Sequence, residues 1–181
     1  MDDRADRIIK DHILWAIGAG LVPLPVLDIV AVTAVQLDML RQLSAHHGVP
    51  FTESEGKAWV TALAGNMVAR VGANALKLIP GVGTILGGVS MSILAGASTY
   101  AMGQVAVGHF ERGGTFADID MRSARRTYEQ ELERGKRVAE GLRTEKKDVI
   151  DKLERLAKLH EKGVLSDEEL EVQKRRVLSG R

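Results

Sequence analysis

Residues 78–110, LIPGVGTILGGVSMSILAGASTYAMGQVAVGHF, decide how this chain folds, because they contain no Asp, Glu, Lys or Arg. Seven of the chain's 19 glycines lie between positions 81 and 108. Glycine weakens an isolated helix in water by about 1 kcal/mol relative to Ala, yet it lets two helix backbones approach closely. We therefore expect one long helix over 82–110 that packs tightly against other helices.

Small residues recur at every fourth position of this stretch. Such residues line one face of a helix, where a neighbouring helix can pack at short range. The spacing predicts either self-association of an apolar hairpin or tight packing inside a soluble helical bundle. The residues that we expect to make these contacts are Gly83, Gly87, Gly88, Ser92 and Gly96.

A shorter apolar stretch occurs earlier in the chain, where Asp28 is the only charged residue between Ile13 and Leu37. In both regions an apolar helical pattern runs into a proline turn and is followed by a second apolar helical pattern. We therefore predict two glycine-rich apolar helical hairpins. Either half of 13–37 is too short to cross a bilayer, so this hairpin would dip into one leaflet or lie in a protein core. The turn motifs are Pro23, Pro25 and Asp28 in the first hairpin, and Pro80 and Gly81 in the second.

The carboxylate of Asp28 has two interpretations. A lone charge in an apolar stretch is costly unless it is paired or hydrated, so Asp28 would mark an ion path in a pore. The interpretation that we favour places it in the first helical turn after Pro25. There, backbone N–H groups and the helix dipole stabilise an anion.

Charge is concentrated in the last part of the chain. Residues 111–181 carry 34 of the 49 charged residues. Apolar residues recur there in steps of three, four and seven, which predicts a long amphipathic helix with coiled-coil character. Acids alternate with its basic clusters, and this favours a solvated helix face over nucleic-acid binding.

The last thirty residues form a separate pattern. Residues 149–161 predict an amphipathic helix that Gly163 stops, and Ser166 with Glu169 forms a capping box for a second helix. Two helices this short bury too little surface to be stable alone, so we expect them to need a partner, either copies of themselves or the rest of the chain. The leucines that would make this contact are Leu153, Leu156, Leu159, Leu165 and Leu170.

The sequence therefore predicts an all-α protein in three parts. Residues 1–118 form an apolar helical domain, 119–148 an amphipathic helical linker, and 149–181 a helix–turn–helix oligomerisation unit.

Several kinds of chemistry are excluded or disfavoured. The chain has no cysteine, which excludes thiol nucleophiles and cysteine-ligated metals. Residues 80–88 resemble a phosphate-binding loop, but Val89 stands where that loop needs a lysine. The adjacent His46 and His47 have no carboxylate at helical spacing to complete a metal site. With 4% aromatic residues, the chain is poorly suited to base stacking. We expect no enzyme activity, cofactor, metal or nucleic-acid partner.

Residues 153–171 resemble the SHOCT domain (short C-terminal domain). The resemblance lies in the spacing of Leu153 and Leu156 before Gly163, followed by Leu165-Ser166 and the acidic turn that leads to Leu170. Leu170 stands where phenylalanine is common in that family. The resemblance implies a role in oligomerisation or protein contacts.

Six motifs between residues 5 and 118 carry a second resemblance. They are Pro23–Asp28, Gln36–Leu43, Gly48–Phe51, Ile79–Thr84, Thr99–Gly103 and His109–Gly114. With these motifs, residues 5–118 resemble the YcjF-like, GTPase-associated domain of unknown function. The resemblance implies a helical bacterial protein at the inner membrane, often fused to a GTPase or encoded beside one, and it carries over no catalytic residue.

Together these patterns predict a non-enzymatic, membrane-associated scaffold protein of bacteria that assembles with itself. Its partners would be other copies of itself and membrane lipid. We expect it at the cytoplasmic face of the inner membrane, because basic tails stay on that side; a cytoplasmic location is the alternative. Other functions left open are a module that recruits a GTPase, a soluble helical homo-oligomer and a pore.

Overall fold

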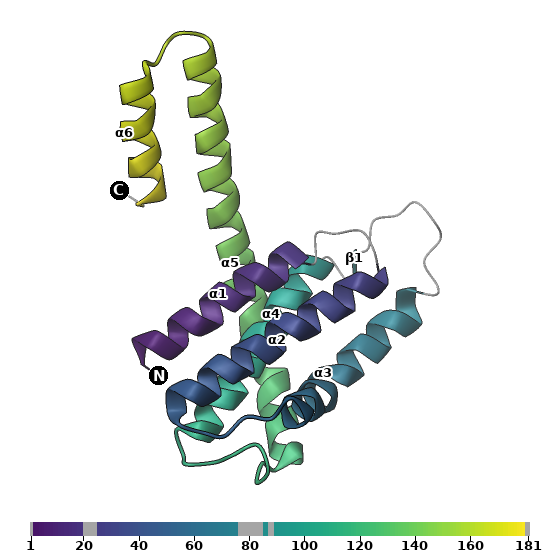
Figure 1. Cartoon of the computed structure of the whole chain (residues 1–181). Helices are drawn as coiled ribbons and strands as arrows, with labels where there is room; N and C mark the ends of the chain where they lie inside the picture. The colour runs from purple at the N-terminus through teal and green to yellow at the C-terminus, as the bar shows by residue number, and fades with distance from the viewer. Residues whose placement is uncertain (1, 20–24, 76–84, 87–88, 180–181) are drawn as a thin grey trace. The chain divides into compact units, whose positions relative to one another are not determined.

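A computed structural model of the chain describes residues 2–19, 25–75, 85–86 and 89–179 (Figure 1), with side chains for 2–18, 30–65 and 91–179. Within these residues the chain forms six helices and one hairpin of two-residue strands, which confirms the all-α class. The elements are α1 (Asp3–Ala19), α2 (Pro25–His47), α3 (Glu53–Ala75), β1 (Ile85–Leu86), β2 (Val89–Ser90), α4 (Met91–Phe110), α5 (Met121–Glu161) and α6 (Asp167–Leu178).

The chain divides into two compact units, which we call unit 1 (Met1–Glu140) and unit 2 (Gly141–Arg181). In unit 1, α1, α2 and α4 contact one another, and α3 packs against α2 and α4. The chain reverses direction from each of these helices to the next, so the end of α1, the start of α2, the end of α3 and the start of α4 lie at the same end of unit 1 (Figure 1). We call this the hairpin end.

Helix α4 provides the centre of unit 1, as its lack of charge predicts. Its residues Ala97, Ala101 and Ala106 are fully buried. Gly103 lets α1 and α2 approach, because a Cβ at this position would lie 2.7 Å from Cγ1 of Ile9 and 3.3 Å from Sδ of Met39. The small side chains of α4 therefore serve packing between helices of the same chain.

The prediction of one helix over 82–110 is wrong at its start. Helix α4 begins at Met91, and Leu86 pairs with Val89 in the antiparallel contact of β1 with β2. Glycines lower helix propensity, and the glycine pair between these strands in the sequence is typical of a two-residue hairpin turn. The low helix propensity of the glycines therefore outweighs the apolar spacing that predicted a helix before Met91.

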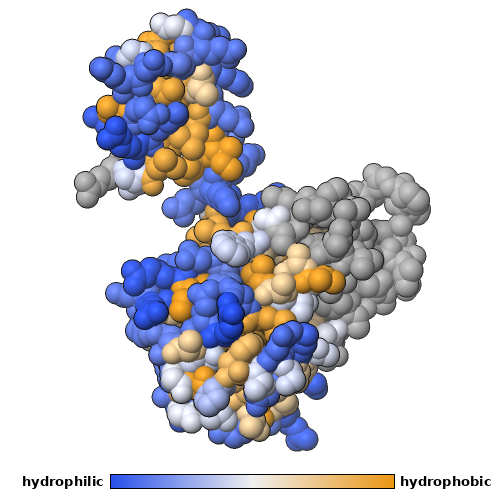
Figure 2. All heavy atoms as spheres, in the orientation of Figure 1, coloured by the Kyte–Doolittle hydropathy of each residue, from blue (hydrophilic) through white to orange (hydrophobic). Residues whose placement is uncertain are grey.

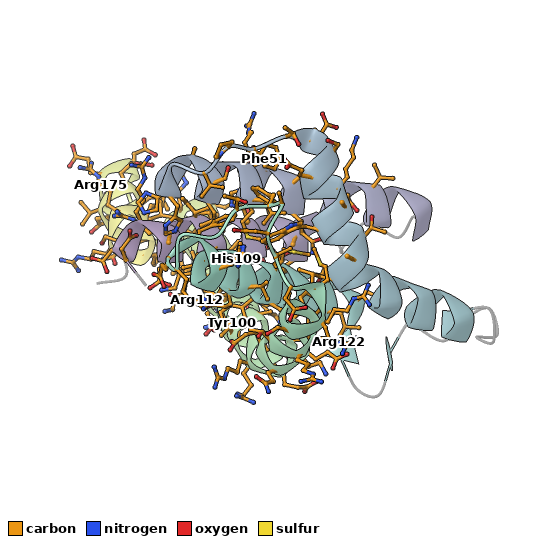
Figure 3. The ribbon with its side chains drawn as sticks, turned by 90° about the horizontal axis from the view of Figure 1, so that it is seen from below. Phe51, Tyr100, His109, Arg112, Arg122 and Arg175 are labelled. Atoms are coloured by element: carbon orange, nitrogen blue, oxygen red, sulfur yellow. The ribbon has the colours of Figure 1, made fainter. Side chains whose placement is uncertain are left out.

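An aromatic cluster occupies the opposite end of unit 1, where α4 ends. Trp59 packs against the rings of Phe110 and Phe116, with ring centroids 5.9 and 4.7 Å away. Its indole Nε1 donates a hydrogen bond to the backbone carbonyl of Phe116 at 3.0 Å. Phe51 and His109, labelled in Figure 3, extend the cluster at its edges. These contacts fasten the segment after α4 onto α3.

Unit 2 is a pair of helices joined by a short turn, as the sequence predicts. Gly163 has a positive φ of 68°, and the N–H of Val164 donates to the carbonyl of Leu159, an arrangement that ends many helices. The hydroxyl of Ser166 accepts a hydrogen bond from the N–H of Glu169, whose carboxylate accepts one from the N–H of Ser166. The predicted capping box is therefore confirmed.

Candidate functional site

The residues predicted for close helix packing fall in two groups. Gly83, Gly87 and Gly88 lie outside the described residues. Ser92 and Gly96 lie on α4 and are buried.

Gly96 lies at a meeting point of three helices. A Cβ at this position would lie 2.9 Å from Cγ1 of Ile17 on α1 and 3.0 Å from Cβ of Ala139 on α5. Gly96 therefore permits close packing within one chain. Its part in self-association stays a prediction.

The structure describes only part of the predicted turn motifs. Pro25 is the first residue of α2, a position that tolerates proline because its N–H would have no helical partner. Asp28 lies in the first turn of the same helix, which is where our favoured interpretation puts it. Pro23, Pro80 and Gly81 lie outside the described residues, as do the side chains of Pro25 and Asp28.

A chain of buried polar side chains links three helices of unit 1. Gln36 on α2 donates from Nε2 to Oγ of Ser98 at 2.9 Å and to Oγ1 of Thr99 at 3.4 Å. The hydroxyls of Ser98 and Tyr128 lie 2.7 Å apart, which extends the chain to α5. Burial raises the pKa of Tyr128 to about 12. These groups are neutral and bonded to one another, so they favour one register of the helices.

Histidines pair with aspartates across the elements of unit 1. Nε2 of His12 lies 3.1 Å from Oδ2 of Asp38, which joins α1 to α2. Nε2 of His46 lies 2.5 Å from Oδ2 of Asp2, at the start of α1. Together these pairs hold α1 and α2 antiparallel. A third pair joins His109 to Asp118, in the segment after α4.

These carboxylates have lowered pKa values. The N–H of Ala5 and the side chain of His46 lower the pKa of Asp2 to about 2. Burial raises the pKa of Asp38, but hydrogen bonds from His12, Gln42 and Arg41 together outweigh burial and lower it. A carboxyl whose pKa is lower in the folded state adds stability above the unfolded pKa. That stability is lost as the pH falls through the folded pKa.

We predict that unit 1 loses stability between about pH 4 and pH 2, and that Asp2→Asn reduces this loss. The amide keeps an oxygen to accept from the N–H groups of Arg4 and Ala5 but removes the titrating charge. Urea unfolding of both proteins across this pH range would measure the effect. The two curves should converge at the acid end; parallel curves would contradict the role assigned to Asp2.

Unit 2 has almost no interior. Among its described residues, Leu170 alone is buried, while Leu153, Leu156 and Leu165 are half-buried. Leu159 is 40% exposed. Figure 2 shows hydrophobic residues open to solvent on the visible face of this unit. The other large apolar residues exposed here are Ile150, Val164, Val172 and Leu178.

The outward face of α1 changes from charged to uncharged along the helix, and this change was not predicted from the sequence. Exposed residues follow one another at helical spacing, and they are charged near the start of the helix and uncharged near the hairpin end. Trp15 is 66% exposed. The residues of this face are Arg4, Arg7, Asp11, Trp15 and Gly18.

The outward face of α2 is apolar near the hairpin end. Val30 is 62% exposed and Ala34 is also exposed, both in the half of α2 nearer the hairpin end. Arg41 and Ala45 follow on the same face, further from that end. Both helices therefore expose apolar side chains close to the hairpin end.

Two further kinds of site are absent from the part of the chain that the structure describes. No helix there is both long enough and apolar enough to cross a membrane. No cluster of three or more His, Asp or Glu side chains there is arranged to hold a metal ion.

Comparison with known families gives two matches. Residues 1–137 match the family described as domain of unknown function (DUF697), and residues 151–178 match the short C-terminal domain (SHOCT). The predicted order, a helical domain of unknown function followed by a SHOCT domain, is confirmed. The narrower YcjF-like label stays a prediction.

Comparison with individual proteins gives one relative of interest. Magnetosome membrane protein 22 of Magnetospirillum gryphiswaldense is 42% identical over 147 residues, which are 78% of this chain and 75% of that protein. No solved structure matches the chain.

Proposed function

We propose that this chain, which belongs to the DUF697 family and carries a SHOCT domain, is a non-enzymatic, membrane-associated protein of bacteria that assembles into a scaffold. The membrane association is supported by the name of its bacterial relative, a magnetosome membrane protein that resembles it over 75% of its length. We place the protein at the cytoplasmic face of the inner membrane, because residues 111–181 carry 18 of its 25 Lys and Arg.

The observation that carries the assembly is the exposed apolar surface of unit 2. Val172 and Leu178 on α6 are 47% and 67% exposed, and Ile150 and Leu159 on α5 are 46% and 40% exposed. Fully burying such a side chain is worth about 1.5–3 kcal/mol. A second copy of the unit offers the same residues and would cover them. The glycine-rich positions from Gly83 to Gly96 provide a second proposed contact.

We predict that Val172→Glu weakens self-association of the full chain by about tenfold or more. The change places a carboxylate in an apolar contact, where a charge without a partner is costly. Leu159→Glu, on the other helix of the unit, should act in the same direction. Sedimentation equilibrium over a range of protein concentrations would measure the dissociation constant of each variant.

Ala157→Glu is the matched control, because Ala157 is exposed on α5 and has little apolar surface to lose. This variant adds the same charge and should assemble like the unchanged protein. A monomeric unchanged protein, or variants with the same mass as it at every concentration, would contradict assembly through unit 2.

Two cellular measurements separate this proposal from the alternatives. Carbonate and detergent washes of fractionated cells test the membrane association, since a protein recovered wholly in the soluble fraction would contradict it. A pull-down from native cells tests the partners. A nucleotide-binding protein recovered in equal amount would favour a module that recruits a GTPase.

A further inference from the structure

We infer that unit 1 contacts the lipid bilayer with its hairpin end, and that Trp15 and Val30 lie at the membrane interface. The inference rests on the membrane association proposed above. It adds the surface that makes the contact and the direction in which unit 1 points.

Charge-poor helix ends converge in unit 1. The end of α1 and the start of α2 lie at the same end of unit 1 as the end of α3 and the start of α4 (Figure 1). Three of these four helix ends come from the two stretches poorest in charge. The end of α1 and the start of α2 belong to 13–37, which contains only Asp28, and the start of α4 belongs to 78–110, which contains no charged residue. The fold therefore places these three charge-poor helix ends at one end of unit 1.

The outward faces of α1 and α2 carry their charges away from the hairpin end. Arg4, Arg7 and Asp11 are exposed on α1 away from that end, whereas Trp15 is exposed near it. On α2, Val30 is exposed near the hairpin end and the charged Arg41 is exposed away from it. Charged side chains are costly in a bilayer, so a helix end that enters an interface is expected to carry apolar side chains there.

The exposed tryptophan has the chemistry of an interfacial side chain. Indole has a large apolar ring and one N–H donor, so tryptophan is enriched where hydrocarbon meets lipid headgroups. The chain has two tryptophans. Trp59 is 1% exposed inside the aromatic cluster at the opposite end, whereas Trp15 leaves 66% of its surface open. Trp15 is therefore the one placed to meet lipid.

The depth of contact follows from the position of these residues. Trp15 lies four residues before the end of α1, and Val30 lies five residues after the start of α2. At 1.5 Å per helical residue, both are about 6–8 Å from their helix ends. Helices that lie flat in an interface bury their apolar faces about 5–10 Å deep, which is a comparable length. With α1 and α2 steep to the bilayer surface, their helix ends would reach this depth in one leaflet and Trp15 would lie at the boundary.

The test uses the full chain with vesicles of phosphatidylcholine, alone and mixed with phosphatidylglycerol. Trp15 emission, obtained by subtracting the spectrum of Trp15→Phe, should shift to the blue on binding and be quenched by brominated lipid. Trp15→Glu and Val30→Glu should each lower vesicle binding about tenfold or more in a flotation assay. Ala45→Glu is the matched control, because Ala45 is exposed on the same face of α2 far from the hairpin end, and it should bind like the unchanged protein.

The outcomes separate this inference from the proposed function. If the unchanged chain floats with the vesicles, but Trp15 emission stays the same and both glutamate variants bind normally, the hairpin end is not the contact and membrane association still stands. If Trp15→Glu alters the mass of the assembly and leaves flotation unchanged, the surface binds a second copy and the inference is wrong. An unchanged chain that never floats with either vesicle would overturn both proposals.

Discussion

Trp59→Ala is expected to lower the free energy of unfolding of unit 1 by about 3–5 kcal/mol. Trp59 is 1% exposed and contacts the rings of Phe110 and Phe116. Alanine would leave a cavity among these rings and remove the donor that binds the carbonyl of Phe116. Urea unfolding followed by circular dichroism would measure the loss.

The second tryptophan of the chain supplies the control. Trp15→Ala removes the same number of atoms from a side chain that is 66% exposed, so the loss of stability should stay below about 1 kcal/mol. Equal losses for the two variants would show that the aromatic cluster does not hold the end of α4 against α3.

Phe116→Leu offers a milder test of the same cluster. It keeps an apolar side chain and leaves the backbone carbonyl that Trp59 binds, so the loss should be smaller than that of Trp59→Ala.

The features that could be predicted from the sequence depend on neighbours in the chain. The capping box joins Ser166 to Glu169, and the stop at Gly163 depends on the φ angle of one residue. A contact over three or four residues follows from helix geometry alone. These local features therefore form in the same way whichever other helices pack nearby.

The aromatic cluster could not be predicted, because its members are far apart in the sequence. Phe51 meets Phe116 across 65 positions, and Trp59 meets Phe110 across 51. The low aromatic content indicated a core of small aliphatic side chains, which describes α4 well. The pairing of histidines with aspartates was missed for the same reason, since His12 meets Asp38 only after the chain reverses direction.

The exposed residues near the hairpin end were missed for another reason. The stretch 13–37 is apolar throughout, so the sequence does not show which side chains face the core. Ile13 and Ile17 are buried, and Trp15 between them is exposed. The sequence did indicate that Trp15 is exposed, because Arg4, Arg7, Asp11 and Trp15 are spaced so that they lie on one face of a helix.

Glycine has opposite effects at two positions of α5. A Cβ at Gly135 would lie 2.7 Å from the carbonyl oxygen of Ala97 and 3.0 Å from its Cα. These are backbone atoms of α4, so they cannot turn aside as a side chain would. At Gly141 nothing lies within 4 Å of the same Cβ. Gly135 is therefore required for the packing of α5 against α4, whereas Gly141 only lowers the helix propensity of α5.

Gly135→Ala is therefore expected to destabilise the protein by about 1–3 kcal/mol through overpacking, although alanine is the better helix former. Gly141→Ala should stabilise the helix by up to about 1 kcal/mol, since only the propensity changes. Thermal unfolding would show opposite shifts in melting temperature. Hydrogen exchange should show faster opening of α4 in Gly135→Ala only.

A stabilising effect at both positions would mean that α4 and α5 do not pack as closely as the structure shows. Opposite effects would show that the close packing of α5 against α4 in one chain needs a residue as small as glycine at position 135. A larger residue at Gly96 would then be expected to destabilise the protein as well. A Cβ there would lie 3.0 Å from Cβ of Ala139, which is also a contact between α4 and α5. The exposed apolar side chains of unit 2 would remain as the surface proposed for contacts between copies.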